Sequence, residues 1–406
     1  MASSRRRFIK QAGALGVAAA AGGSAAVSRT ARARRKHSDP SVKKRTGPFG
    51  KGLPITIAGY EYGRVRALAE GNVTVDGCSH RFEETSIGPL NNHAFFGPRT
   101  RDVTEIGLIP YVLAYCNDGF RDYTLLPIPV LRLFRHQSIF IRTDRGIKAP
   151  ADLRGRRVAT VGYSSSGLTH VRGILQEEYG VKPEEIEWVS TQKDSAANLT
   201  GGVSDWEKVR PEGVSITNAP EGEDESTLLI SGQVDAILHP AEPKVYQDRN
   251  PLVERLFKDH RSVERDFYRR TGMFPIMHSV AIRRETAEKN PWLAKATFEA
   301  YSKAKRIDYE RMQSWGWVTE SLPWYGQELE ETRELMGMNF YPYGLKASRR
   351  SYEAAFRYLH EQGLSKRRVD LEEMFERSTL ELTEDADSSR DASRHQPPAS
   401  EAPPNR

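Results

Sequence analysis

The clearest candidate for a binding site is a run of hydroxyl side chains between a short apolar strand, predicted at 157–161, and a helix predicted at 168–179. The residues of this run are Tyr163, Ser164, Ser165, Ser166 and Thr169. Free N–H groups and the positive end of the helix dipole favour an anion at a helix N-terminus. The hydroxyls add hydrogen-bond donors, and Tyr163 can stack on an aromatic ring. The same residues also fit a serine N-cap in a flexible turn, so both interpretations stay open.

Two arginines offer fixed positive charge for such an anion. Arg135 can bind a carboxylate with two parallel hydrogen bonds, and its neighbour His136 can transfer a proton near neutral pH. The alternatives are a structural ion pair for Arg135 and a buried hinge position for His136. Arg172 lies one turn inside the predicted helix, where a salt bridge along the helix is the competing role.

A histidine and a carboxylate stand three positions apart after another short strand. His239 and Glu242 follow the strand predicted at 234–238, and together they can act as an acid–base pair or cap a turn. Tyr60 and Tyr62 follow the first strand, predicted at 53–58. These two rings can close over an aromatic ligand or belong to the core.

The sequence predicts no metal and no cofactor. Its histidines and acids lack the H-E-x-x-H spacing, and there is no Gly-rich phosphate fingerprint and no G-x-S-x-G elbow. The two cysteines, Cys78 and Cys116, form no disulfide framework, and whether they pair stays open.

The elements that position these residues alternate between strands and helices. Further strands are expected at 138–142 and 279–282, and further helices near Gly63, at 292–311 and at 351–361. This alternation indicates an α/β fold, in which ligands bind beyond the carboxyl ends of the strands.

The N-terminus is typical of an export signal. Residues 4–10 read S-R-R-R-F-I-K, a mild Ala/Gly-rich stretch follows, and small residues come next, so we expect a twin-arginine signal over 1–33 that directs the chain to the periplasm. The formal charge of +6 is confined to this segment, because its six basic residues have no acidic counterpart and the rest of the chain is balanced. A nucleic-acid partner is therefore not expected. We expect a linker over 34–52 and a disordered tail over 384–406.

Several blocks of the sequence, in order, carry a family resemblance. They are F-R-H-Q-S-I-F-I-R-T-D at 134–144, V-R-G-I-L-Q at 171–176 with E-Y-G-V at 178–181, T-G-M-F-P-I-M-H at 271–278, Y-P-Y-G at 341–344 and H-E-Q-G-L-S at 360–365. Over about 53–375 the chain resembles the 4,5-dihydroxyphthalate decarboxylase family. The family's V-P-E-Y-Q-M-T loop is replaced here by V-G-Y-S-S-S-G at 161–167, without the acidic residue.

The resemblance implies a two-lobed fold like that of type II periplasmic binding proteins, with a ligand cleft between the lobes. Lobe 1 would comprise 53–137 and 277–380, and lobe 2 would comprise 138–276. His278, which ends one of the blocks, is expected to be a buried hinge residue.

Two functions fit these observations. The first is a carboxy-lyase that removes carbon dioxide from a hydroxylated aromatic carboxylate, with Arg135, Arg172 and the Ser164–Ser166 loop binding the anion. In that case His239 or His136 would handle the proton, with Glu242 as partner. The second is an extracytoplasmic solute-binding protein of the ABC-transporter type, which delivers an aromatic or carboxylated ligand to a membrane permease. Either protein would depend on the twin-arginine translocase for export.

Overall fold

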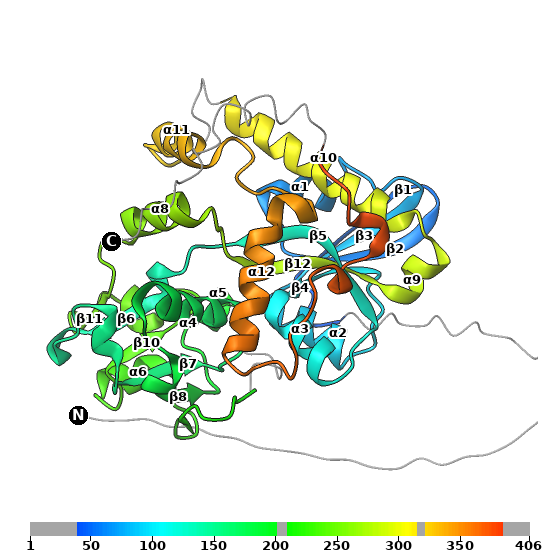
Figure 1. The fold of residues 1–406 in the computed structure, drawn as a ribbon. Helices are drawn as coiled ribbons and strands as arrows, with labels where there is room; N and C mark the ends of the chain where they lie inside the picture. The colour runs from blue at the N-terminus through cyan, green and yellow to red at the C-terminus, as the bar shows by residue number, and fades with distance from the viewer. Residues whose placement is uncertain (1–38, 201–208, 315–320, 385–406) are drawn as a thin grey trace, which may run out of the picture. The chain divides into compact units, whose positions relative to one another are not determined.

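The chain builds two separate β-sheets, each flanked by helices (Figure 1). A computed structural model describes residues 39–200, 209–314 and 321–384. The predicted signal over 1–33 and all but the first residue of the predicted tail lie outside the described residues. From Pro40 onward the chain forms one compact unit. None of the described helices is both long and apolar enough to cross a membrane.

The first sheet has six strands in the order β1-β3-β2-β4-β12-β5. Their bounds are β1 Lys44–Gly50, β3 Cys78–Glu84, β2 Leu53–Gly59, β4 Val103–Gly107, β12 Ile276–Arg283 and β5 Tyr123–Arg132. Strand β2 runs parallel to β3 and β4, whereas β12 is antiparallel to both of its neighbours. The carboxyl ends of β2, β4 and β5 therefore lie at the same edge as the start of β12.

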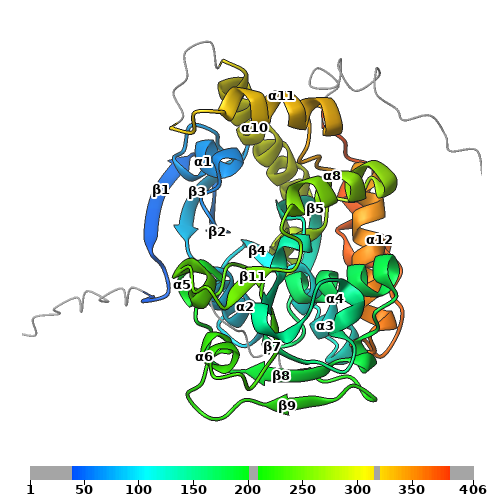
Figure 2. The ribbon, with the colours of Figure 1, turned by 90° about the vertical axis from the view of Figure 1, so that its left-hand side faces the viewer.

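The second sheet also has six strands, in the order β11-β6-β10-β7-β8-β9, and its β7, β8 and β9 lie together in Figure 2. Their bounds are β11 Val253–Arg255, β6 Ile139–Arg142, β10 Ala236–Leu238, β7 Arg157–Val161, β8 Glu187–Thr191 and β9 Ile216–Asn218. Strands β10, β7, β8 and β9 are parallel, and β6 is antiparallel to β10. We call the sheet with β2 lobe 1 and the sheet with β7 lobe 2, each with its flanking helices.

Twelve α-helices cover the sheets in the described part of the chain. They are α1 Gly63–Ala69, α2 Ile87–Phe95, α3 Leu108–Asn117, α4 Ser166–Tyr179, α5 Ala197–Thr200, α6 Glu225–Ile230, α7 Lys244–Gln247, α8 His260–Thr271, α9 Arg284–Lys289, α10 Leu293–Gln313, α11 Tyr325–Met336 and α12 Leu345–Glu361. Two sheets with interleaved helices confirm the predicted two-lobed α/β class.

The chain passes between the two sheets twice. It leaves the first sheet after β5, builds the second sheet, and returns after α8 to insert β12 between β4 and β5. Helix α12 packs against α4 of lobe 2 and against α3, β5 and β12 of lobe 1, so one hydrophobic core extends into both lobes (Figure 1). This packing is tight: a Cβ at Gly173 of α4 would lie 2.3 Å from the Tyr358 ring of α12.

Residues 44–50 differ from the sequence-based expectation. They lie in the predicted linker, yet they form β1, which pairs antiparallel with β3. The Gly and Pro residues, such as the Gly47–Pro48 pair, and the basic composition favoured a linker in the sequence. Both features are tolerated here because β1 is an edge strand with a register shift between Thr46 and Phe49, so a missing N–H costs no central ladder bond.

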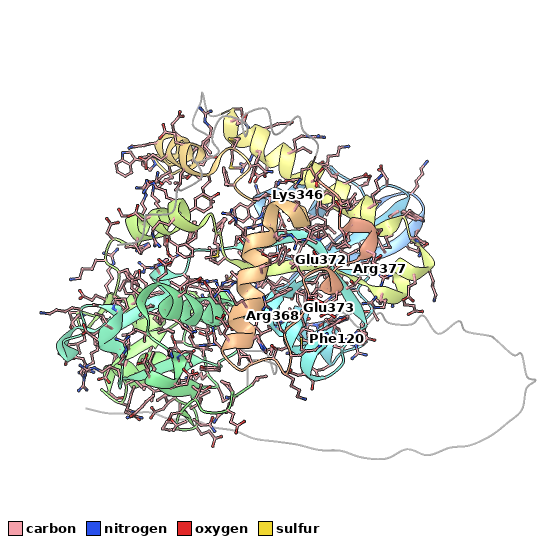
Figure 3. All side chains as sticks on the ribbon, viewed as in Figure 1. Phe120, Lys346, Arg368, Glu372, Glu373 and Arg377 are labelled. Atoms are coloured by element: carbon pink, nitrogen blue, oxygen red, sulfur yellow. The ribbon has the colours of Figure 1, made fainter. Side chains whose placement is uncertain are left out.

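The C-terminal segment covers the other edge of the first sheet. Phe375 forms a parallel bridge with Leu125 of β5, and the Glu376 N–H donates to the Leu125 carbonyl. Charged side chains of both signs occur along this segment, among them Arg368, Glu372, Glu373 and Arg377 (Figure 3). Pairing and charge together protect the β5 edge from association with another chain. Glu384 ends the described segment and forms an ion pair with the buried Lys305, so it belongs to the folded part and not to the predicted tail.

Candidate functional site

A buried carboxylate at the edge of lobe 1 gathers three hydrogen-bond donors. Glu105 of β4 accepts from the Tyr62 hydroxyl at 2.7 Å, from the Tyr60 backbone N–H at 3.0 Å and from His278 Nδ1 at 2.6 Å. Glu105 is 3% exposed, and a Cβ at Gly59 would lie 3.0 Å from its Oε2 atom. The carboxylate is therefore fixed in place by the two strands and the loop around it.

The bond to Glu105 sets the tautomer of His278. A carboxylate only accepts, so Nδ1 carries a proton and Nε2 is left to accept or, in the imidazolium, to donate. The His278 side chain remains 11% exposed, and no described residue bonds to its Nε2. A histidine with a carboxylate on one nitrogen and a reachable second nitrogen is the arrangement that general acid–base catalysis uses.

Tyr60 and Tyr62 lie in the loop after β2, against the Glu105–His278 pair. The Tyr60 ring stacks on Tyr62 at 5.5 Å between centroids and on His278 at 6.0 Å, and the Tyr60 hydroxyl accepts from the Ile87 N–H at the start of α2. Burial, and then the Glu105 charge, raise the pKa of both phenols well above the usual value. Both tyrosines therefore stay neutral and act as donors and stacking surfaces.

The Ser loop of lobe 2 meets lobe 1 at the start of α3. Ser165 caps α4 by accepting from the Leu168 N–H, and Ser166 Oγ accepts from the Ile109 N–H at 3.1 Å. Ser164 and Thr169 are buried, and Thr169 Oγ1 accepts from Arg172. The N-cap interpretation thus holds for Ser165, while the loop also lies where the two lobes contact each other.

Arg135 lies beside the start of α4 with its charge uncompensated by any ion pair among the described residues. It donates to the Pro240 carbonyl at 2.7 Å and to Met277 Sδ at 3.2 Å, and its Nη2 lies 3.3 Å from where a Cβ of Gly167 would be. Burial lowers the pKa of Arg135 to about 10, so it remains a cation at neutral pH. The guanidinium and the α4 N-terminus together can hold an anion.

Arg172 and Tyr163 are turned into the core of lobe 2. The Arg172 guanidinium lies 3.8 Å from the Tyr163 ring centroid and donates to the Tyr163 carbonyl and to Gln362 on the chain after α12. Both residues are 1% exposed, and Tyr163 packs on Trp188. The structure thus places them behind the Ser loop, where they support it, rather than on an open surface.

His136 lies in an aromatic shell made by Tyr179, Phe257 and Phe267. Neither ring nitrogen has a hydrogen-bond partner among the described residues, and burial lowers the pKa of His136 to about 4. The imidazole is neutral at physiological pH and its shell offers no acid partner. This placement fits the hinge interpretation, and the proton-transfer role of His136 stays a prediction.

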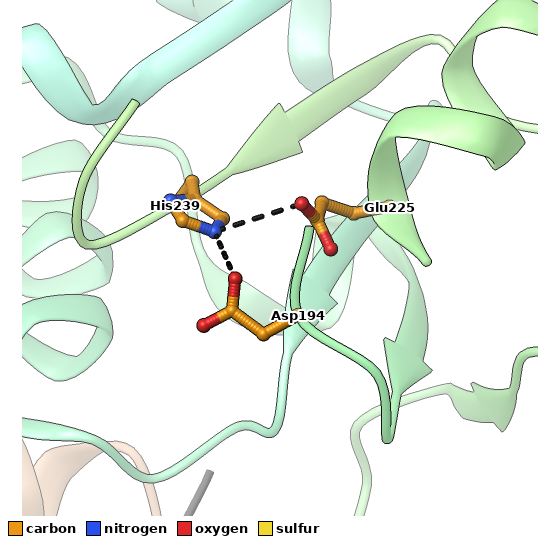
Figure 4. A group of neighbouring side chains, drawn as sticks. All are labelled: Asp194, Glu225 and His239. Carbon is orange, nitrogen blue, oxygen red and sulfur yellow. Dashed lines mark hydrogen bonds and ion pairs between the residues drawn. The ribbon is translucent and has the colours of Figure 1, made fainter. Parts of the chain in front are cut away.

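His239 does not pair with Glu242, which corrects the sequence-based expectation. Glu242 is half exposed and binds Arg255, whereas His239 Nε2 lies 3.1 Å from Asp194 Oδ1 and 3.6 Å from Glu225 Oε1 (Figure 4). The two carboxylates come from the loop after β8 and from the first residue of α6, so only the fold brings them to His239. Burial raises the pKa of Glu225. At Asp194 burial acts in the same direction, but hydrogen bonds from His239, Thr200 and the Ala196 N–H outweigh it and lower the pKa.

Asp194, Glu225 and His239 offer three ligand atoms within 4.8 Å of one another, which makes the group a candidate metal site. The Ala241 N–H, however, donates to His239 Nδ1 at 3.0 Å, so the ring proton lies on Nε2, the atom that faces both carboxylates. A metal-bound histidine needs the opposite tautomer, with Nδ1–H donating to an acceptor. The geometry therefore fits a hydrogen-bonded lock between the β8 and β10 loops better than a metal centre.

The structure thus brings together four residues, of which sequence reasoning had placed only the two tyrosines in a ligand site. Tyr60 and Tyr62 adjoin Glu105 and His278, and the latter had been given a hinge role. Glu105 belongs to no motif, because it is a lone acid in the strand V-T-E-I-G. An acid within an apolar strand was the one sequence feature that could have pointed to it, and the structure shows that the strand is fully buried.

The architecture, with two sheets and two chain crossings, defines a two-lobed α/β protein whose strand ends carry polar side chains. A 4,5-dihydroxyphthalate decarboxylase of Comamonas testosteroni is 34% identical over 334 residues, covering 81% of this chain and 98% of the relative. One of Pseudomonas putida is 33% identical over 220 residues, covering 53% of this chain and 82% of the relative. The chain belongs to the 4,5-dihydroxyphthalate decarboxylase family.

Broader comparisons give more distant likenesses. The family model described as NMT1/THI5 like matches residues 129–305. The aliphatic sulphonate binding protein SsuA of Escherichia coli has a TM-score of 0.47 at 17% identity, covering 82% of this chain and 99% of that one. The desulfurization enzyme DSZB has a TM-score of 0.42 at 15% identity, covering 85% and 100%. At these values no ligand or site residue is carried over to this chain.

Proposed function

We propose that this chain is a carboxy-lyase that removes carbon dioxide from a dihydroxylated aromatic carboxylate of the 4,5-dihydroxyphthalate class, without a cofactor. Family membership supports the reaction class. The observation that carries the proposal is the Glu105–His278 pair, which supplies a proton donor with one reachable nitrogen at the edge where the strands of lobe 1 end.

The chemistry needs an electron push and a proton. Electrons from a ring hydroxyl para to the leaving carboxylate make the ipso carbon basic, and that carbon takes a proton to form a new C–H bond. The bond to the carboxylate then breaks, its electron pair restores the aromatic ring, and carbon dioxide leaves. His278 Nε2–H gives the proton, while Glu105 stabilises the imidazolium that must be present beforehand.

Other residues hold the substrate. The Tyr60 ring, stacked beside His278, offers a face for the aromatic ring of the substrate. Arg135 and the start of α4 bind the carboxylate that the product retains. A fixed cation on the leaving carboxylate would stabilise the charged ground state over neutral carbon dioxide, so it would oppose the reaction.

The direct test is product formation. Purified protein without residues 1–33, incubated with 4,5-dihydroxyphthalate, is expected to release one carbon dioxide per 3,4-dihydroxybenzoate formed, with or without a chelator, as followed by chromatography and gas release. Tight binding of the substrate with no product at any pH between 6 and 9 would instead identify a solute-binding protein. The solute-binding function is supported by the N-terminal sequence, because it favours export and an enzyme of intracellular catabolism does not need to be exported.

We also propose that the twin-arginine translocase exports the chain to the periplasm. Residues Ser4 to Lys10 fill the positions of such a signal, and this pathway depends on its paired arginines. Replacing Arg5 and Arg6 together by lysine is expected to leave the protein in the cytoplasmic fraction with its signal uncleaved. An unchanged periplasmic yield in a host with a working translocase would show that the paired arginines do not direct export. The matched control is Arg29→Lys with Arg32→Lys.

A further inference from the structure

Arg64 is a cation of lobe 1 that the site described so far does not use. It is the second residue of α1, directly after the loop that carries Tyr60 and Tyr62. Its guanidinium lies between two aromatic faces, 4.3 Å from the Tyr62 ring centroid and 4.1 Å from that of Tyr341. Arg64, Tyr62 and Tyr341 are all partly exposed, so the stack is not closed off in the core.

The charge of Arg64 has no counter-ion among the described residues. Its hydrogen bonds to the described residues, from Nε and Nη2, both go to the Val130 carbonyl, which leaves Nη1 for another acceptor. Asp308 of α10 has its carboxylate beside Gly63 at the start of α1, and its ion pair is with Arg311. A guanidinium stacked between two aromatic faces, with Nη1 left over, can take an oxygen anion as a further partner.

Arg64 is joined to the proton donor His278 through two side chains, Tyr62 and Glu105. The Tyr62 ring that lies against the guanidinium carries the hydroxyl that donates to Glu105, and Glu105 holds His278. An aromatic substrate with its ipso carbon at His278 has its para oxygen on the far side of one benzene ring. Arg64 and the Glu105–His278 pair border the same tyrosine, Arg64 at its ring face and Glu105 at its hydroxyl.

We propose that Arg64 binds the substrate's ring hydroxyl para to the leaving carboxylate and stabilises it as a phenolate. The inference rests on the proposed decarboxylation, which needs electron density from that oxygen. A permanent cation beside a phenol favours loss of its proton, and the same charge offsets the negative charge on the oxygen from which the electrons are pushed. Arg64 would thus be a catalytic residue that activates the ring, opposite the proton donor.

The test uses a catechol that cannot decarboxylate and whose colour reports its ionisation. In 4-nitrocatechol a flat nitro group stands where the carboxylate would be, with a hydroxyl para to it. Bound to the wild-type protein it is expected to ionise about 1 to 3 pH units lower than in free solution, as read from its visible spectrum. In Arg64→Gln this shift is expected to disappear, whereas Arg66→Gln, an exposed neighbour on the same helix, keeps it.

Activity gives the second measurement. Arg64→Gln is expected to lower kcat for 4,5-dihydroxyphthalate at least about 30-fold and Arg64→Lys less, because a lysine restores the charge without the planar fork. If Arg64→Gln does not fold, Arg64→Met decides, because it also removes the charge: a nitrocatechol shift equal to the wild-type shift contradicts the proposal. So does a wild-type protein that fails to bind nitrocatechol at millimolar concentration or leaves its ionisation unchanged. The spectral result needs no turnover, so it stands apart from a failure of the decarboxylase assay.

Discussion

Replacing His278 by glutamine is expected to lower kcat for 4,5-dihydroxyphthalate by about 10² to 10⁴, the range typical of losing a positioned general acid. Glutamine preserves a donor toward Glu105 but cannot carry a transferable proton. The ligand still meets the Tyr60 face and Arg135, so we expect its dissociation constant, measured calorimetrically with phthalate, to change less than about threefold. A fall in kcat with binding intact is the result that separates chemistry from folding.

Two further variants sharpen this experiment. Glu105→Gln leaves His278 in place but removes the carboxylate that orients its ring, so we expect a fall in kcat that is smaller than in His278→Gln. His360→Gln, an exposed histidine near the end of α12, is the matched control and should behave as wild type. Wild-type turnover in His278→Gln would end the assignment of the proton donor, and His239 would then be tested next.

The residues of this pair show why the site was only partly predictable. The sequence placed polar residues correctly at strand ends, since strands and loops are local features with local signals. It could not show that Glu105 on β4 faces His278 on β12, 173 positions later in the chain. That contact exists because β12 returns from lobe 2 and inserts beside β4, with His278 opposite Gly107. Antiparallel insertion of this kind leaves no trace in nearby residues.

The same reasoning explains the outcome at His239. A carboxylate three positions away in the sequence was the natural partner, but the turn sends Glu242 outward to Arg255. Asp194 and Glu225 reach His239 because the parallel strands β8 and β10 end at one edge of the sheet and α6 begins there. Sequence proximity is therefore a weak guide to side-chain pairing wherever parallel strands place loops side by side.

The fold itself was more accessible than the site. Alternating strands and helices predicted the α/β class, and strand 157–161 has the predicted bounds. Helix α12 begins at Leu345, six residues before the predicted start. The spacing of apolar residues predicts the interior of a helix, whereas its first turn, here after the N-cap Gly344, depends on tertiary contacts. Strand β1 was missed because an exposed edge strand has no apolar alternation to detect.

The second large effect is expected at Arg135. Changing it to glutamine removes the guanidinium charge beside the start of α4 and is expected to weaken phthalate binding about 100-fold, in line with the loss of a buried charged hydrogen bond. Arg154→Gln, an exposed arginine paired with Glu185, is the control and should not alter affinity.

A pH dependence follows from the carboxyl group that faces this arginine. Burial raises the pKa of Glu264 to about 7, against the Gln137 N–H bond and the Arg135 charge, which lower it. Below pH 7 the carboxyl group is neutral and the guanidinium is free for a ligand; as pH rises through 7, Glu264 ionises and competes for it. Wild-type affinity for phthalate should therefore fall between pH 6 and 8, while Glu264→Gln should bind equally at both.

Because the folded-state pKa lies above the unfolded one, Glu264 also favours folding at acidic pH, and this contribution is lost as pH rises from about 4.5 through 7, by about 3 kcal/mol in total. Urea unfolding at pH 5 and pH 8 should show that loss in the wild type and a smaller pH dependence in Glu264→Gln. Equal pH dependence of both binding and stability in the two proteins would mean that Glu264 does not control Arg135.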